Sequence, residues 1–359
     1  MEFISEYGLF LAKSITVIIT VGVIVLIVIA ASSKGDGESA GKIDIKKVND
    51  KFDDVVDLFN DAIIDEDVRQ QQRKAEKKQL KKEQKEKKKL AKKSASTKSS
   101  DTEGEAIAEK PRVFVASFDG DVKASETEEL REIITGILSV AKPTDEVVLK
   151  LESPGGMVHS YGFASSQLAR ITEKNIPLTI CVDKVAASGG YMMACVADKI
   201  ISAPFAVIGS IGVVAQLPNF HKLLKKNDID YETLTAGEYK RTLTVFGENT
   251  DKGREKFVED LEQTHTLFKD FIREHRPIVD IEKVATGEIW FGSQAIEQKL
   301  IDKIQTSDAY IYDLHKTADI FELSFVTKQT LAEKLGIGVE VSITRVFNRF
   351  WQYSQAKFF

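Results

Sequence analysis

The chain has 359 residues and a mass of 40.0 kDa, with 43% hydrophobic and 29% charged residues. This composition excludes a collagen, a coiled coil throughout and wholesale disorder, and the length suffices to bury one large core or two modest ones. Two cysteines, Cys181 and Cys195, exclude a disulfide framework and a CxxC-type zinc site. The net charge of −5 averages unlike segments, because residues 69–98 alone carry 14 basic against three acidic side chains.

The first predicted element is a transmembrane helix. An uncharged run of 20 residues, dense in Ile and Val, lies between Lys13 and Lys34. At 1.5 Å per residue it covers roughly 30 Å of hydrocarbon. A cleaved signal peptide is the alternative, but Glu2 and Glu6 stand where its positive n-region should be. We therefore expect residues 1–34 to form a single-pass anchor, with lysines after it that favour a cytoplasmic flank.

Residues 35–110 are predicted to link this anchor to a globular body. Apolar residues at steps of three and four predict an amphipathic helix formed by Ile45, Val48, Phe52, Val55 and Phe59. The stretch 69–93 has almost no apolar residues and indicates a charged, partly helical stalk that buries no core. We interpret it first as a solvated linker and second as a segment near anionic lipid headgroups. A nucleic-acid site is disfavoured because no aromatic residues interleave with the lysines.

Residues 111–325 alternate between strand and helix patterns. Apolar runs predict strands at 112–118, 146–152 and 178–182, with helices between them at 125–141 and 160–174. Such alternation predicts an α/β domain with a largely parallel sheet and right-handed crossovers. Functional groups are then expected in the loops that follow the strands.

Two of these loops could carry chemistry. Gly155 and Gly156 follow a buried strand, and consecutive glycines allow backbone N–H groups to face an anion; an ordinary tight turn is the alternative. Ser188 precedes Gly189 at a second strand-to-helix junction, where the helix dipole would favour a developing alkoxide or oxyanion. The alternative for Ser188 is a helix N-cap.

A nucleophilic serine requires a base, and two residue types could supply it. None of the five histidines has a distinctive setting: His159, His221, His265, His275 and His315. A lysine can serve when burial lowers its pKa towards neutrality. Lys240, which has glycine and tyrosine neighbours, is the candidate, although an ordinary solvent-facing lysine is the alternative.

Four blocks in this order and spacing resemble the signal peptide peptidase A family of serine proteases: SPGGMVHSYG, VDKVAASGGYMMACVADKI, SAPFAVIGSIGV and GEYKRTL. The resemblance covers about residues 110–320 and implies a crotonase-like, Clp-protease-like α/β fold with a Ser/Lys dyad. It implies that Ser188 is the nucleophile and Lys240 the general base. The N–H of Gly189 and one N–H from Gly155 or Gly156 would form the oxyanion hole.

The resemblance also implies an assembly and a location. Family members of this size take serine and lysine from neighbouring subunits, so a homo-oligomer is expected, and residues 326–359 are predicted to form an amphipathic oligomerisation segment. Docking of that segment on the membrane surface is the alternative. The family places its catalytic domain on the periplasmic side of the bacterial inner membrane. It cleaves signal-peptide remnants or membrane-protein fragments, and no cofactor, metal or nucleic acid is expected.

Two other functions compete with this interpretation. An acyl-CoA hydratase or isomerase could use the same fold and oxyanion geometry, but the predicted anchor and the Ser188-Gly189-Gly190 block speak against it. A catalytically silent scaffold that binds peptides or membrane proteases belongs to a different class. Loss of cleavage on substitution of Ser188 would separate an enzyme from a scaffold.

Overall fold

The computed structural model describes residues 41–75 and 110–326 continuously, and isolated positions between 7 and 22 and between 77 and 85. Within these residues, no helix combines the length and hydropathy that a membrane crossing requires. Most of the predicted anchor at 1–34 and all but the first residue of the predicted segment at 326–359 lie outside the described residues.

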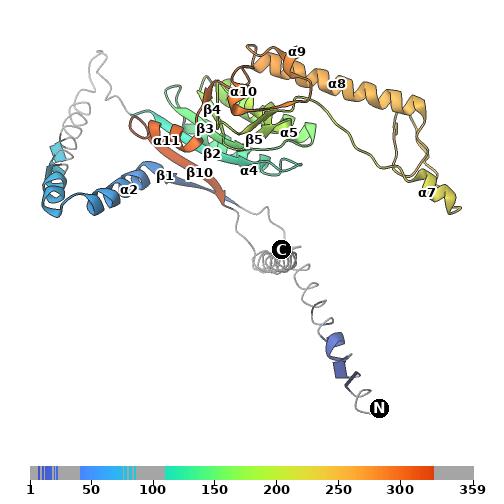
Figure 1. Cartoon of the computed structure of the whole chain (residues 1–359), viewed down its shortest axis with the longest axis horizontal. Coiled ribbons are helices and arrows are strands. Elements are labelled where there is room, and N and C mark those ends of the chain that lie inside the picture. Colours follow the sequence, from blue (N-terminus) through green and yellow to red (C-terminus); the bar gives the residue numbers. More distant parts are fainter. Residues whose placement is uncertain are drawn as a thin grey trace, which may run out of the picture. The chain divides into compact units, whose positions relative to one another are not determined.

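A mostly parallel sheet forms the centre of the domain (Figure 1). Its seven strands are, in spatial order, β1 (Lys42–Lys47), β10 (Asp319–Val326), β2 (Arg112–Asp119), β3 (Glu146–Glu152), β4 (Leu178–Val182), β6 (Lys199–Ser202) and β9 (Lys303–Ile304). A second sheet contains β5 (Val185–Ala187), β7 (Val207–Gly209) and β8 (Ile289–Phe291), with β7 antiparallel to β8. The α/β class with a largely parallel sheet is therefore confirmed.

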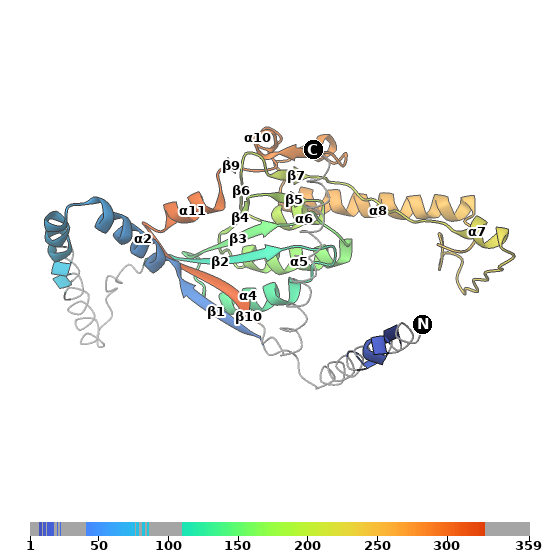
Figure 2. The same cartoon turned by 60° about the horizontal axis from the view of Figure 1, so that its bottom comes forward.

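Helices cover both faces of the large sheet (Figure 2). The helices are α2 (Val48–Ile63), α4 (Thr127–Val140), α5 (Val158–Thr172), α6 (Gly189–Ala194), α7 (His221–Lys226), α8 (Asp251–His275), α9 (Ile281–Val284), α10 (Gly292–Ala295) and α11 (Ser307–Leu314). Side chains from α2 and α11 pack on one face, and α4 and α5 lie on the other. Because both faces are covered, β4 is apolar except for Thr179, and β3 has an apolar run at residues 147–149, as expected for buried parallel strands.

The predicted strands and helices from 112 to 182 are confirmed, with ends that shift by no more than a few residues. One earlier element differs. Ile45 was grouped with the amphipathic helix, but it lies in β1, and α2 begins only at Val48. A β-branched residue fits a strand edge as well as a helix face, so spacing alone did not separate the two.

Residues near the start of α2 join it to the domain. Val48 and Phe52 pack against the core face that contains Ile320. The Asn49 amide donates to the Ala318 carbonyl at 3.0 Å, and its oxygen accepts the Ile320 N–H at 2.7 Å. The compact unit accordingly extends over Ile43–Ser324. The division at 34, 110 and 325 stays a prediction, but β1 and α2 pack with the sheet rather than apart from it.

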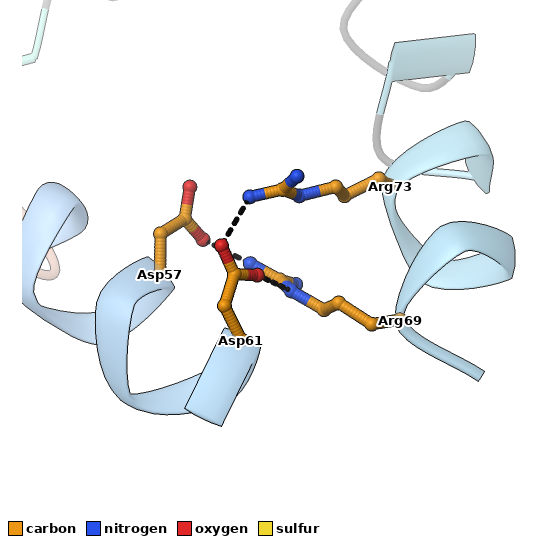
Figure 3. Close-up of polar contacts among 4 residues, drawn as sticks. All are labelled: Asp57, Asp61, Arg69 and Arg73. Atoms are coloured by element: carbon orange, nitrogen blue, oxygen red, sulfur yellow. Dashed lines mark hydrogen bonds and ion pairs between the residues drawn. The ribbon is translucent and has the colours of Figure 1, made fainter. Parts of the chain in front are cut away.

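Two aspartates near the end of α2 bind two arginines of the following helical segment, 66–75 (Figure 3). Arg69 contacts Asp57 and donates its Nε to Asp61 at 2.8 Å, while Arg73 donates to the other Asp61 oxygen at 2.6 Å. The hydrogen bond from Arg69 lowers the pKa of Asp61. The first part of the basic stretch is therefore helical and folds back on α2 through charge pairs.

A buried carboxylate fixes the start of two central strands. Asp145, 2% exposed, accepts the backbone N–H of Arg112 at 3.0 Å and that of Lys142 at 2.8 Å, and it pairs with the Arg112 guanidinium at 2.6 Å. Burial alone would raise the pKa of Asp145, but the hydrogen bonds from Arg112 and Lys142 outweigh it and lower the pKa.

We expect Asp145→Ala to reduce the free energy of unfolding by about 3 kcal/mol, because it leaves buried donors without an acceptor. Asp145→Asn should lose less, since its oxygen still accepts one N–H. Because the native pKa of Asp145 lies below the unfolded value, its stabilisation is present above about pH 4 and disappears as the pH falls through the native pKa. Urea titrations at pH 7 and pH 3 would contradict this assignment if the wild type and Asp145→Asn differed equally at both.

Candidate active site

Ser188 lies in a strained turn between β5 and α6. Its backbone has φ +52° and ψ −119°, a conformation that side-chain-bearing residues rarely adopt. The Ser188 N–H donates to the Gly209 carbonyl at 2.7 Å, which ties the turn to β7. Although Ser188 occupies the N-cap position of α6, its side chain makes no capping hydrogen bond. The N-cap alternative is therefore wrong, and the hydroxyl is left beside a cavity.

The loop that follows β3 lies directly against this turn. A Cβ added to Gly155, whose φ is +90°, would lie 2.7 Å from the Ser188 Cβ and 2.7 Å from the Gly189 nitrogen. A Cβ on Gly156 would lie 2.2 Å from the Val122 carbonyl oxygen. Neither position has room for a side chain, so the two glycines allow the backbones to touch. The structure thus brings together Ser188, Gly189, Gly155 and Gly156.

Three successive N–H groups in this loop have different partners. The Gly155 N–H donates to the Ser153 hydroxyl oxygen at 3.1 Å, and the Met157 N–H donates to the Val122 carbonyl at 2.8 Å. Between them, the Gly156 N–H has no acceptor among the described residues. Gly189 is the first residue of α6, where an N–H lacks an intrahelical acceptor. Of the three candidate glycines Gly155, Gly156 and Gly189, the last two therefore have an N–H that is available to an oxyanion.

A cavity of about 820 Å³ opens beside Ser188. It is lined by side chains or backbone from five segments, within residues 154–158, 188–192, 210–214, 264–268 and 285–287. Val158, Met192 and Phe268 supply apolar wall, and backbone at the glycines supplies polar groups. A site of this size, lined by both apolar and polar groups, is typical of a pocket for part of a peptide or a small ligand.

Lys240 does not reach this cavity within one chain. It is exposed, and it lines a different cavity together with Leu217, Tyr231 and Phe246. The segment that carries it runs between α7 and α8, and α7 lies by the end of α8 that projects away from the sheets (Figures 1 and 2). The predicted pair of Ser188 and Lys240 is thus not assembled by a single copy.

Two polar residues that the sequence did not single out lie in the Ser188 cavity. Ser210 lines it with φ +52°, held by its N–H to the Glu288 carbonyl at 2.7 Å. His265 also lines it, and its buried Nε2 has no hydrogen-bond partner among the residues that the structure describes. Ser210 belongs to a motif block already quoted, whereas nothing in the sequence around His265 distinguishes it from the other histidines.

The two cysteines are structural within the described chain. Cys181 and Cys195 are both buried, and burial raises the pKa of each thiol. Thiols of this kind are poor nucleophiles at neutral pH. Across the described residues, no group of histidine, cysteine and carboxylate side chains has the arrangement of a metal site.

Comparison with known proteins identifies the family. Residues 2–168 match "Peptidase family S49 N-terminal", and residues 170–320 match "Peptidase family S49". The chain belongs to peptidase family S49. The family-level resemblance of the sequence is thereby confirmed, and the Ser188 cavity becomes the candidate active site of an S49 peptidase.

Several bacterial relatives carry the name "Probable protease SohB". The protein from Haemophilus influenzae is 48% identical over 351 residues, which cover 97% of this chain and 96% of the relative. The protein from Buchnera aphidicola subsp. Acyrthosiphon pisum is 52% identical over 244 residues, or 68% of this chain and 73% of the relative. The protein from subsp. Schlechtendalia chinensis is 64% identical over 201 residues, or 56% and 66%.

We expect Gly156→Ala to lower kcat/KM for peptide cleavage by about 100-fold, because the added Cβ meets the Val122 backbone and moves the free N–H. Gly162→Ala is the matched control. Gly162 lies in α5 with nothing within 4 Å of an added Cβ. That substitution should leave activity unchanged and raise stability by up to about 1 kcal/mol. Equal activity of the two variants would contradict the role given to this loop.

Proposed function

We propose that the protein is a serine endopeptidase that uses Ser188 with Lys240 from a neighbouring copy. The Ser188 Oγ attacks the scissile carbonyl carbon while its proton passes to the neutral lysine amine. The N–H groups of Gly156 and Gly189 stabilise the tetrahedral oxyanion. The lysine then returns the proton to the leaving amine as the C–N bond breaks, and water hydrolyses the acyl-enzyme ester.

The observation that supports assembly is the exposure of residues 214–246, which we call the arm. Residues 214–246 of the chain contain no buried side chain, yet many of them are large and apolar. Leu234 is 93% exposed and Val214 is 80% exposed. Apolar surface on this scale marks a site of interaction, because a segment with no fully buried side chain gains little stability from its own folding. A second copy of the chain is the partner we propose.

This arm carries Lys240, and its own copy offers no place for the amine beside Ser188. If the arm packs on the neighbouring copy, the same contact covers its apolar residues and delivers Lys240 to the neighbour's Ser188 cavity. Removal of the amine from water would favour its neutral form, which a general base requires. Within that cavity, the strained Ser210 is the hydroxyl that we assign to orient the amine. The monomer would then be inactive.

His265 supports a second candidate for the base. It already lies in the Ser188 cavity of the same copy, so a histidine could serve without assembly. The two alternatives differ in whether nucleophile and base belong to one chain, and that difference can be measured.

Ser188→Ala and Lys240→Ala should each abolish cleavage of casein or a model peptide. Coexpression of the two variants should restore activity, because a random oligomer would place an intact serine beside an intact lysine at about a quarter of its sites. Coexpression of Ser188→Ala with His265→Ala is the matched comparison. If His265 of the same copy were the base, Lys240→Ala alone would stay active, and the mixture of Ser188→Ala with His265→Ala would recover no activity.

A scaffold function predicts a different result. Wild type and Ser188→Ala would then bind peptides equally and cleave nothing, and a fluorophosphonate probe would not label Ser188. Equal cleavage by wild type and Ser188→Ala would exclude this dyad altogether.

The pH dependence tests the chemical nature of the base. Activity with a lysine base should rise with pH until the amine has lost its proton. A histidine of ordinary pKa, about 6.5, would give a plateau by about pH 8. A profile of kcat/KM that is flat between pH 6 and 9 in the purified oligomer would contradict a lysine base.

We further propose the finer features that the family implies. The domain would have the crotonase-like, Clp-protease-like arrangement, with residues 1–34 as its anchor in the bacterial inner membrane and the catalytic domain in the periplasm. An extended peptide from a signal-peptide remnant or membrane-protein fragment would add as a strand beside residues 212–214, with small or apolar side chains entering the cavity. A reporter fused after Phe359 and active only in an oxidising compartment would support this orientation.

A further inference from the structure

Two fully buried hydroxyl groups lie directly behind the glycine loop. Ser153 directly follows β3, and Tyr161 belongs to α5. Both residues are 0% exposed. The Ser153 Oγ lies 2.5 Å from the Tyr161 Oη, and that Oη donates to the Asp121 carbonyl at 2.7 Å. The Gly155 N–H completes the series by donating to the Ser153 Oγ at 3.1 Å.

The direction of every hydrogen bond in this series can be assigned. A carbonyl oxygen can only accept, so the single hydroxyl hydrogen of Tyr161 is used on Asp121. Ser153 must therefore donate to Tyr161, which leaves its lone pairs for the Gly155 N–H. Burial raises the pKa of Tyr161, so its hydroxyl keeps this hydrogen at neutral pH. The result is one continuous chain from the Gly155 N–H to the Asp121 carbonyl.

Three glycines lie so close to Ser153 and Tyr161 that a side chain at any of them would clash with this pair. A Cβ on Gly120 would lie 2.4 Å from the Ser153 Oγ, and one on Gly189 would lie 2.4 Å from the Tyr161 Cγ. A Cβ on Gly190 would lie 2.4 Å from the Ser153 carbonyl oxygen. The tyrosine ring thus contacts the backbone next to the nucleophile, while its hydroxyl holds the loop opposite.

The far end of the chain is itself fixed. The Asp121 carboxylate accepts the N–H of Lys123 at 3.0 Å and the N–H of Ser125 at 2.9 Å. The next residue, Val122, uses its carbonyl to accept the Met157 N–H. The loop after β2 therefore holds the glycine loop at two points, on either side of the free Gly156 N–H.

We propose that Tyr161 and Ser153 are positioning residues that aim the Gly156 N–H at the oxyanion. This inference rests on the proposed function, because it concerns the same hydrolytic site. Loss of the Ser153 hydroxyl would leave the Gly155 N–H without its acceptor. Loss of the Tyr161 hydroxyl would leave the Ser153 side chain without the partner that fixes it. Either change would let the neighbouring peptide group rotate. The substrate would still bind, but the oxyanion would lose a well-placed donor.

The test compares Tyr161→Phe, Ser153→Ala and the double variant in the full-length oligomer. We expect kcat for a chromogenic peptide to fall about 10–100-fold, with KM changed by less than about twofold. The affinity for a peptide aldehyde, whose hemiacetal oxygen occupies the oxyanion position, should fall by the same factor as kcat/KM. The affinity for the cleaved product peptide should stay unchanged. The double variant should be no worse than the poorer single variant, because one chain is broken in each case.

Tyr310→Phe is the matched control. Tyr310 is also buried and donates its hydroxyl to Glu146 at 2.6 Å, but it belongs to α11 and the opposite core face. It should lose stability without any change in kcat or aldehyde affinity. The same outcome for Tyr161→Phe, with lowered stability but full kcat and aldehyde affinity, would overturn the proposal.

Different results would contradict the proposed hydrolytic function and the positioning role of Tyr161 and Ser153. If Ser188→Ala cleaves as well as the wild type, the proposed function is wrong. If Ser188→Ala is inactive while Tyr161→Phe and Ser153→Ala retain full kcat, only the positioning role is wrong. If Tyr161→Phe does not fold, Ser153→Ala decides the question, since it breaks the chain one bond closer to Gly155.

Discussion

The candidate site depends on a direct contact between two stretches of backbone. The loop after β3 and the turn at Ser188 approach so closely that Gly155 has no space for a Cβ. A parallel bridge between Ser153 and Ala186 brings the two loops together, and the glycines then let them touch. That contact places Ser188 and the N–H groups of Gly156 and Gly189 around one cavity.

Local features of this arrangement could be predicted from the sequence. Strand β4 is a continuous apolar run, and the Gly155-Gly156 pair directly follows strand β3, so both the sheet and its glycine loop were evident. Ser188 was recognised because its neighbours are small and it sits where a strand meets a helix. These properties depend on residues that are adjacent in the chain, and such short-range signals survive without knowledge of the tertiary contacts.

Long-range features could not be predicted in the same way. His265 shares a cavity with Ser188 only because α8 lies beside α6, and Ser153 pairs with Tyr161 through packing that no spacing reveals. Strand β1 was missed because Ile45 continued the apolar stripe of α2. Lys240 is the clearest example. A sequence motif identified it, but within one copy it lines a different cavity from Ser188.

The position of β1 changes how the basic stretch should be regarded. This strand lies at the edge of the main sheet, next to β10, and the chain returns to the same sheet at β2. The lysine-rich stretch between α2 and β2 therefore connects two elements of one domain. It does not act as a spacer between that domain and another part of the chain.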